Sequence, residues 1–190
     1  MIKKKDDTLI CQLKITLKNI EPPIWRRIQV HGDITLFRLH EYIQGFMGWE
    51  NYHMHEFRIK GQRYGKPDPD GEALFGAKTN KDKGFKVCDL VSDGDVFEYV
   101  YDFGDDWRHE IEVEKVMEAE AGAVYPTCLA GERACPEEDC GGPWGYQEML
   151  EILKEPEHED YEHYFEWLGG EFDLEEFDLD EVNGHFDKVQ

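Results

Sequence analysis

The most constraining feature of this sequence is a two-residue hydrophobic period near its start. Between residues 9 and 17, one side of the period carries Leu9, Cys11, Leu13, Ile15 and Leu17. Successive side chains of a strand point to opposite faces of a sheet, so this spacing predicts a half-buried strand. The turn "NIEPP" and the stretch "IWRRIQVH" then predict a returning strand, and the two together form a hairpin.

The alternation of apolar and polar residues continues through the first two thirds of the chain. The stretches "YHMHEFRIKGQRY", "VFEYVYDF" and "WRHEIEVEKV" each predict a strand, and the last two are joined at "GDD" as a second hairpin. One helix interrupts them, because Thr35 is a suitable N-cap for "TLFRLHEYIQGFMGW". The apolar residues of that helix share one face: Leu36, Leu39, Ile43, Phe46 and Met47. Residues 65–84, rich in Gly, Pro and charge, predict a mobile loop.

In the last third of the chain, apolar residues recur at the spacing of a helix. Pro143 begins a predicted helix over "PWGYQEMLEILK", and "PEHEDYEHYFEWLGG" predicts a second one. The acidic tail predicts an extended segment and a short terminal helix. We therefore expect one α+β domain over 1–190, a mixed β-sheet roll with a covering helix and a helical C-terminal segment. Its parts are a sheet-rich region 8–127, a cysteine loop 128–142 and a helical region 143–190.

The charge of the chain narrows the classes of function. Its 190 residues include 21 basic and 43 acidic side chains, for a net charge of −22. Such a surface repels phosphate backbones and anionic membranes, so we expect neither direct nucleic-acid binding nor membrane binding. The N-terminal stretch alternates instead of running apolar, so no signal peptide or membrane span is expected. An odd number of cysteines, five, then favours a cytoplasmic protein with free or metal-bound thiols.

Three of those cysteines lie in "CLAGERACPEEDCGG", with the spacing C-x6-C-x4-C. A structural zinc site uses four ligands and usually contains a close cysteine pair, and only the second gap fits that range. A zinc site would comprise Cys128, Cys135, Cys140 and, as the best-placed fourth ligand, His109. The alternative is a loop held by buried thiols and by Gly and Pro turns. A redox role is disfavoured, because there is no C-x-x-C and neighbouring acids raise a thiol's pKa.

Two further stretches contain candidate ligands. In "YHMHEF", His53 and His55 are predicted to share a strand face with Phe57 and Ile59, where packed histidines are more typical than metal ligands. In "PDPDGE", the acids Asp68, Asp70 and Glu72 lack the ligand spacing of a calcium loop and predict a solvated loop.

The stretch "YDFGDDWRHE" contains an Asp-Phe-Gly triplet but none of the other elements of a protein kinase. It predicts a hairpin corner in which Asp105 or Asp106 hydrogen-bonds the turn. Asp102, Asp105 and Asp106 could also hold a divalent cation, although a turn is the simpler interpretation. Nucleophilic chemistry has little support, because the one serine, Ser92, lies in a "SDGD" turn without a G-x-S-x-G elbow.

Several stretches carry a resemblance to a known family. They are "PPIWRRIQV", the helix followed by "HMHEF", "YVYDFGDDWRHEIEVE" and "YPTCLAGERACPEEDCGGPWGY". From about Leu9 to Lys154, and less distinctly in "FDLEEFD", the chain resembles the plasmid pRiA4b ORF-3-like family. The resemblance implies an α+β roll and an association with plasmids and transposons, and it brings no catalytic residues. It places recurrent polar positions at His55, Asp102, Asp105, Trp107, His109, Cys128, Cys135 and Asp139.

Some members of that family are labelled transposon resolvases, and the residues of this chain argue against that activity. A serine recombinase needs an activated serine near its N-terminus and a basic DNA-binding domain, whereas this chain has one serine in mid-sequence and a net charge of −22. A tyrosine recombinase needs a cluster of arginine and histidine around the scissile phosphate, and no such constellation is evident.

Our first hypothesis is therefore a non-catalytic binding module that recognises an unidentified protein or small-molecule ligand. Its surface would lie where "YDFGDDWRH" meets the cysteine loop. The candidate residues are His55, Asp102, Asp105, Trp107, His109 and Trp144. The alternative is a zinc-dependent enzyme or structural zinc protein built on Cys128, Cys135 and His109, with Glu110 or Asp139 as the base in an enzyme. A third hypothesis, mimicry of nucleic acid by the acidic surface, ranks last.

Overall fold

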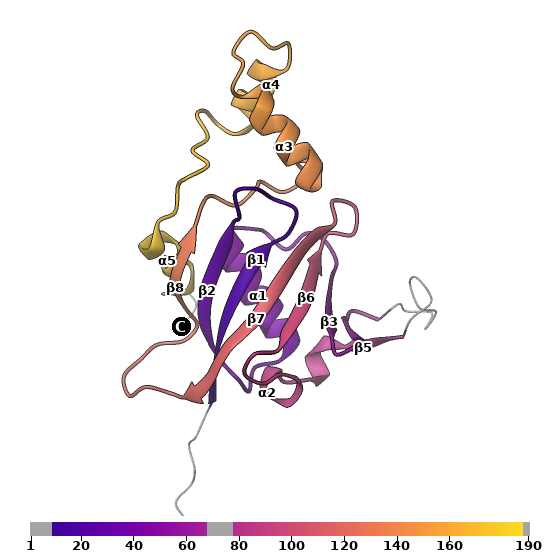
Figure 1. Cartoon of the computed structure of the whole chain (residues 1–190), viewed down its shortest axis with the longest axis vertical. Helices are drawn as coiled ribbons and strands as arrows, with labels where there is room; N and C mark the ends of the chain where they lie inside the picture. Colours follow the sequence, from indigo (N-terminus) through magenta and orange to yellow (C-terminus); the bar gives the residue numbers. More distant parts are fainter. Residues whose placement is uncertain (1–8, 68–77, 188–190) are drawn as a thin grey trace, which may run out of the picture.

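One eight-stranded sheet organises residues 9–67 and 78–187, which are the residues that the computed structural model describes (Figure 1). The strand order is β5-β4-β3-β6-β7-β1-β2-β8. All neighbours are antiparallel except β4 and β5, which pair in parallel, so the sheet is mixed. The strands are β1 (Leu9–Leu17), β2 (Trp25–His31), β3 (His55–Ile59), β4 (Gln62–Gly65), β5 (Thr79–Lys81), β6 (Val96–Tyr101), β7 (Trp107–Glu118) and β8 (Thr127–Glu132).

Helix α1 (Leu36–Met47) covers one face of this sheet (Figure 1). It begins where the Thr35 side chain accepts a hydrogen bond from the Arg38 amide at 3.2 Å, and it ends at Gly48, whose φ is 80°. The five apolar residues predicted to share its inner face are all buried, as are Cys11, Leu13, Ile15 and Leu17 of β1. The α+β class, with a helix covering a mixed sheet, is thus confirmed.

The remaining helices surround the sheet edges and the C-terminal end. They are α2 (Val87–Leu90), α3 (Gly142–Ile152), α4 (Tyr161–Trp167) and α5 (Leu179–Asp187), with a short 3-10 turn at Asp82–Gly84. Figure 1 shows α3 and α4 projecting beyond the sheet, whereas α5 lies beside β8. None of the helices in the described ranges is long and apolar enough to cross a membrane.

Helix α5 returns the C-terminal segment to the roll. Asn183 accepts a hydrogen bond from the Cys128 amide at 2.7 Å and donates one to the Cys128 carbonyl at 3.0 Å. Phe186 packs on Phe46 with ring centroids 4.4 Å apart. A Cβ at Gly45 would lie 2.6 Å from the Phe186 ring, so a glycine in α1 makes this contact possible.

Three predicted elements differ from the structure. The single strand predicted over residues 52–64 is a hairpin of β3 and β4, turning at Lys60 and Gly61 with φ values of 48° and 76°. The predicted cysteine loop begins with a strand, β8, which pairs with β2. The predicted loop 65–84 contains β5 and the 3-10 turn, and the acids Asp68, Asp70 and Glu72 lie outside the described residues.

Candidate functional site

Three segments that are distant in sequence meet at one end of the sheet, and we call them together the corner site. They are residues 49–54 after α1, residues 102–106 between β6 and β7, and residues 136–144 leading into α3. The Trp49 indole donates to the Pro136 carbonyl at 2.8 Å, and the Glu50 amide donates to Glu138 at 2.7 Å. The Gly141 amide donates to Asp105 at 3.2 Å. The "YDFGDDWRH" turn and the cysteine loop therefore meet, as the sequence predicts.

Gly142 sets how closely the cysteine loop approaches the β6–β7 turn. Its φ is 69°, a left-handed conformation that favours glycine. A Cβ there would lie 2.2 Å from the Asp105 carbonyl oxygen, which is closer than any real contact. The start of α3 can lie against the turn only because this residue has no side chain.

The β6–β7 turn is held by Asp102. Its backbone is left-handed, with φ of 53°, and its Oδ1 accepts a hydrogen bond from the Gly104 amide at 2.9 Å. The Asp102 carbonyl accepts another from the Asp106 amide at 2.6 Å. Aspartate tolerates this conformation because its short carboxylate can bond the local backbone. The second carboxylate oxygen of Asp102 is left facing the corner site.

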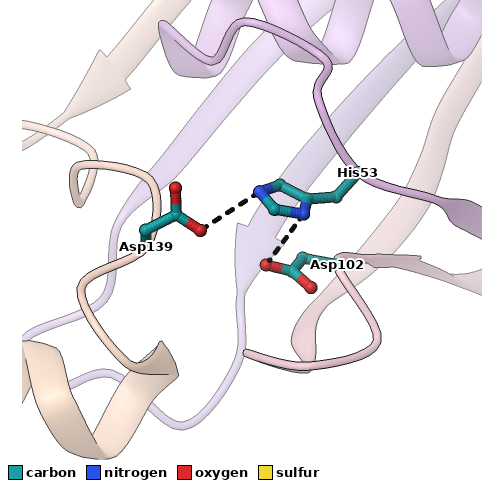
Figure 2. A group of neighbouring side chains, drawn as sticks. All are labelled: His53, Asp102 and Asp139. Carbon is teal, nitrogen blue, oxygen red and sulfur yellow. Dashed lines mark ion pairs between the residues drawn. The ribbon is translucent and has the colours of Figure 1, made fainter.

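That oxygen lies near His53, which in turn faces Asp139 (Figure 2). His53 Nδ1 is 3.6 Å from Asp102 Oδ2, and His53 Nε2 is 3.2 Å from Asp139 Oδ1. The Asp102 side chain is 12% exposed and that of Asp139 is 70% exposed. Within the described residues, these three form the one group of His, Cys, Asp or Glu with three ligand atoms within 4.8 Å of one another.

The three corner segments also carry exposed aromatic and other large hydrophobic side chains. Tyr52 and Met54 lie on either side of His53 in the chain, Phe103 follows Asp102, and Trp144 lies at the start of α3. Trp144 is 82% exposed and Tyr52 is 73% exposed. Apolar side chains so exposed on segments that meet form a surface suited to a ligand or partner.

Two of the predicted surface residues lie in the core instead. Trp107 and His109 are 1% and 0% exposed, so neither forms part of the exposed corner. Both pack against Trp49, with ring centroids 5.9 and 5.3 Å away. Burial lowers the pKa of His109 to about 4, which keeps its imidazole neutral. These residues support the corner site from inside the molecule, while Asp102, Asp105 and Trp144 belong to it.

His55 belongs to a different group, which we call the buried histidine cluster: His40, His55, Asp82 and Tyr99. His55 Nε2 is 2.8 Å from Asp82 Oδ2, and the His55 ring stacks on His40 with centroids 3.5 Å apart. His40 Nδ1 lies 2.7 Å from the Tyr99 hydroxyl. Burial, and then the neighbouring His55, lower the pKa of His40 to about 3.

The sequence predicts that the two histidines of "YHMHEF" share a strand face, and the structure shows that they do not. β3 begins at His55, so His53 lies before the strand and turns toward the corner site. The His40 ring holds this connecting segment, since its Nε2 lies 2.8 Å from Asn51 Oδ1. Asn51 has a left-handed backbone, with φ of 62°, and this bend separates the two side chains.

The predicted zinc ligands do not assemble into a four-ligand group in the described structure. No three of Cys128, Cys135, Cys140 and His109 have ligand atoms within 4.8 Å of one another, as His53 and its partners do. Cys128 Sγ donates to the Ala130 carbonyl at 3.4 Å, and Cys135 Sγ accepts from the buried Arg26 guanidinium at 3.1 Å. Burial raises the pKa of Cys140 to about 12. All five cysteines are free.

Sequence reasoning missed the pairing of His53 with Asp139 and the roles of His40 and Asp82. Asp139 is 86 positions from His53, and no spacing rule connects them. Glu138 fixes the loop that carries Asp139, because its two carboxylate oxygens accept hydrogen bonds from the Tyr101 hydroxyl and the Glu50 amide. A sequence signal existed for the turn alone, in the Asp-Phe-Gly-Asp-Asp composition of residues 102–106.

The protein is thus a mixed-sheet α+β protein. Its corner site brings acidic and exposed aromatic residues together on three connecting segments. The chain belongs to the family described as plasmid pRiA4b ORF-3-like protein, whose family model matches residues 9–181.

Two known proteins are similar over most of the chain. The uncharacterized protein y4hQ of Sinorhizobium fredii (strain NBRC 101917 / NGR234) is 40% identical over 163 residues, which cover 84% of this chain and 81% of that protein. The crystal structure of the protein of unknown function MM3350 from Methanosarcina mazei Go1 is similar with a TM-score of 0.84 and 42% identity. That match covers 94% of this chain and 99% of the other. Neither name states an activity, so a functional proposal has to start from the site.

Proposed function

We propose that this protein is a non-catalytic binding module of the cytoplasm, and that its corner site recognises a positively charged group of a protein or small-molecule ligand. The observation that carries the proposal is the concentration of exposed large hydrophobic side chains on the same three segments that carry the carboxylates. Of the ten large hydrophobic side chains exposed in the described residues, four lie on the corner segments: Tyr52, Met54, Phe103 and Trp144. Scattered exposure would not concentrate them on three segments that meet.

The charge of the corner site favours a cationic ligand. Its three segments contain seven Asp or Glu residues and no lysine or arginine. Exposed tryptophan and tyrosine rings attract ammonium and guanidinium groups through their π faces, and nearby carboxylates add to that attraction. An anionic ligand such as a nucleic-acid backbone would be repelled by the same residues.

Binding, as opposed to covalent catalysis, is supported by the thiol within the corner site. Cys140 is 8% exposed, and the rise of its pKa to about 12 keeps the sulfur protonated and poorly nucleophilic near neutral pH. Free thiols at all five cysteines suit a reducing compartment, which supports the cytoplasmic assignment.

The proposal can be tested by fluorine NMR on protein labelled with 5-fluorotryptophan, which places a probe at each of the five tryptophans. The ligands are a set of small fragments that bear an ammonium or guanidinium group, matched with fragments of the same shape that bear a carboxylate. Trp144 reports on the corner site, and Trp167 of α4, 43% exposed, is the matched control. Cationic fragments should shift the Trp144 resonance and leave Trp167 unchanged.

The variant Tyr52→Ala removes one exposed ring without touching the buried core, and it should weaken those shifts several-fold. The variant Val124→Ala, at a side chain 58% exposed outside the corner segments, should leave them unchanged. Equal shifts at Trp144 and Trp167, or equal response to cationic and anionic fragments, would show that the corner site is ordinary surface.

A further inference from the structure

We propose that the corner site binds a divalent first-row metal ion through Nε2 of His53 and Oδ1 of Asp139, with Asp102 orienting the imidazole from its other nitrogen. This inference rests on the proposed function, since it assigns a metal ion as one positively charged ligand of the same acidic surface.

The geometry of the two ring nitrogens assigns these roles. Figure 2 shows Asp139 facing one ring nitrogen of His53 and Asp102 facing the other. Nε2 and Asp139 Oδ1 are 3.2 Å apart, which is the separation of two neighbouring ligands that each lie about 2.1 Å from one ion. The 3.6 Å gap on the Nδ1 side suits an orienting contact to Asp102.

The state of Nε2 is an independent observation that points to a ligand. This nitrogen is shielded from solvent and makes no hydrogen bond within the described residues, because Asp139 is close to it but not aligned for one. Leaving a buried polar atom without a hydrogen bond is destabilising. A metal ion between Nε2 and Asp139 would satisfy the nitrogen lone pair and the carboxylate together.

Asp102 is built to hold the ring in place. Its side chain is largely buried, and the Gly104 amide fixes one of its oxygens, so the other can accept a hydrogen bond from Nδ1–H of His53. A carboxylate on the remote nitrogen is the usual partner of a metal-binding histidine, because it sets the tautomer that leaves the other nitrogen free to coordinate.

The donor set indicates the class of ion. One imidazole and one carboxylate suit Mn²⁺, Fe²⁺ or Zn²⁺ better than Mg²⁺ or Ca²⁺, which prefer sites made of oxygen. Asp139 is mostly exposed, so the remaining coordination positions face solvent and remain open to water or to a bound ligand.

Mn²⁺ is the probe of choice, because it has little affinity for the five thiols that would compete for Zn²⁺. The protein is first treated with a chelator, and Mn²⁺ is then added. The decrease in the electron paramagnetic resonance signal of free Mn²⁺ gives the number of ions bound per chain. NMR of histidine-labelled protein locates the ion, since bound Mn²⁺ broadens nearby ring resonances. The matched control is His158, whose Nδ1 lies 3.9 Å from Asp160 on the surface and which has no second carboxylate among its described ion pairs.

One Mn²⁺ per chain is expected, with the His53 ring broadened well before that of His158. His53→Gln and Asp139→Asn should each weaken binding at least tenfold, and Asp102→Asn, which keeps an oxygen in place, about 10–100-fold. His158→Gln should change nothing, and excess Mg²⁺ should not displace the ion. Unchanged binding in His53→Gln, equal broadening at both histidines, or no bound Mn²⁺ would overturn the inference.

The two proposals fail separately. Trp144→Ala should abolish fragment binding and leave the Mn²⁺ count unchanged, because Trp144 is not a ligand. Fragment binding without Mn²⁺ would refute the metal site alone, whereas one bound Mn²⁺ without fragment binding would refute the recognition role alone.

Discussion

His53 and His55 are separated by one residue, yet they belong to two sites that are built differently. In the buried histidine cluster, His55 is paired with Asp82, and both nitrogens of its stacking partner His40 have partners as well. In the corner site, one nitrogen of His53 has no hydrogen bond within the described residues, and the carboxylate facing it is exposed.

The two sites differ in the parts of the structure that surround them. Residues of α1, β3, β6 and the 3-10 turn enclose the buried histidine cluster, so its polar groups must satisfy one another. The corner site is made by loops at the end of the sheet, and solvent or a ligand completes it. We infer that the first cluster stabilises the fold and that the second is available for binding, and three measurements test that contrast.

The largest expected effect comes from replacing each histidine by alanine. His55→Ala leaves the buried Asp82 carboxylate without its partner at 2.8 Å and removes the ring stacked on His40, so it should lower the free energy of unfolding by about 3–5 kcal/mol. His53→Ala, on the more exposed ring, should change it by about 0.5 kcal/mol or less. Urea unfolding of the two variants and the parent protein measures both values.

This pair of variants is its own control, since the substitution is the same and the positions are two apart. Similar losses for both would mean that the corner site is as structural as the buried histidine cluster. A small loss for His55→Ala would mean that Asp82 finds other partners.

Much of the fold was predictable from the sequence, because the sheet is built from strands that alternate. β1, β2, β6 and β7 each bury one side of a two-residue period, and α1 carries its own cap at Thr35. β8 could not be found in this way, because "TCLAGE" has small residues and little alternation. It is a strand because β2 offers it an edge, which is a tertiary cause.

The site was less predictable than the fold. The burial of Trp107 and His109 did have a signal, since both fall on the same side of the period as Ile111 and Val113. The convergence of His53 with Asp139 had none, because it depends on left-handed bends at Asn51 and Asp139 and on hydrogen bonds between distant loops. Such contacts follow from the assembled fold and not from local spacing.

A second expected effect concerns the closure of the corner site. Gly142→Ala should lower the free energy of unfolding by about 3 kcal/mol, because a left-handed alanine costs about 1–3 kcal/mol and the new Cβ would also collide with the Asp105 carbonyl. Gly48→Ala is the matched control, since its φ is 80° but a Cβ there would meet nothing within 4 Å. It should cost about 1 kcal/mol.

Thermal unfolding compares the two glycine variants, and the Mn²⁺ measurement adds a functional reading. Gly142→Ala should weaken Mn²⁺ binding because it displaces the loop that carries Asp139, whereas Gly48→Ala should not. Equal stability losses would show that the loop and the turn are not held as closely as the geometry indicates.

The smallest expected effect is the pH dependence of the buried histidine cluster. The pKa of His40 is about 3 in the folded protein, below its ordinary value of about 6.5, because burial and the adjacent His55 oppose its charge. The unfolded chain therefore takes up this proton first as the pH falls. The stabilisation from a neutral His40 is complete above pH 6.5 and is lost progressively toward pH 3. By pH 5 this histidine alone should account for a loss of about 2 kcal/mol.

Urea unfolding at pH 7 and pH 5 measures that loss. His40→Gln should be less stable than the parent at pH 7, but its further loss on going to pH 5 should be smaller by about 2 kcal/mol. His109, also buried and neutral, supplies a remaining pH dependence in the same direction. A parent profile that is flat between pH 7 and pH 5 would mean that the buried histidine cluster accepts a proton without opening, and the contrast with the corner site would then disappear.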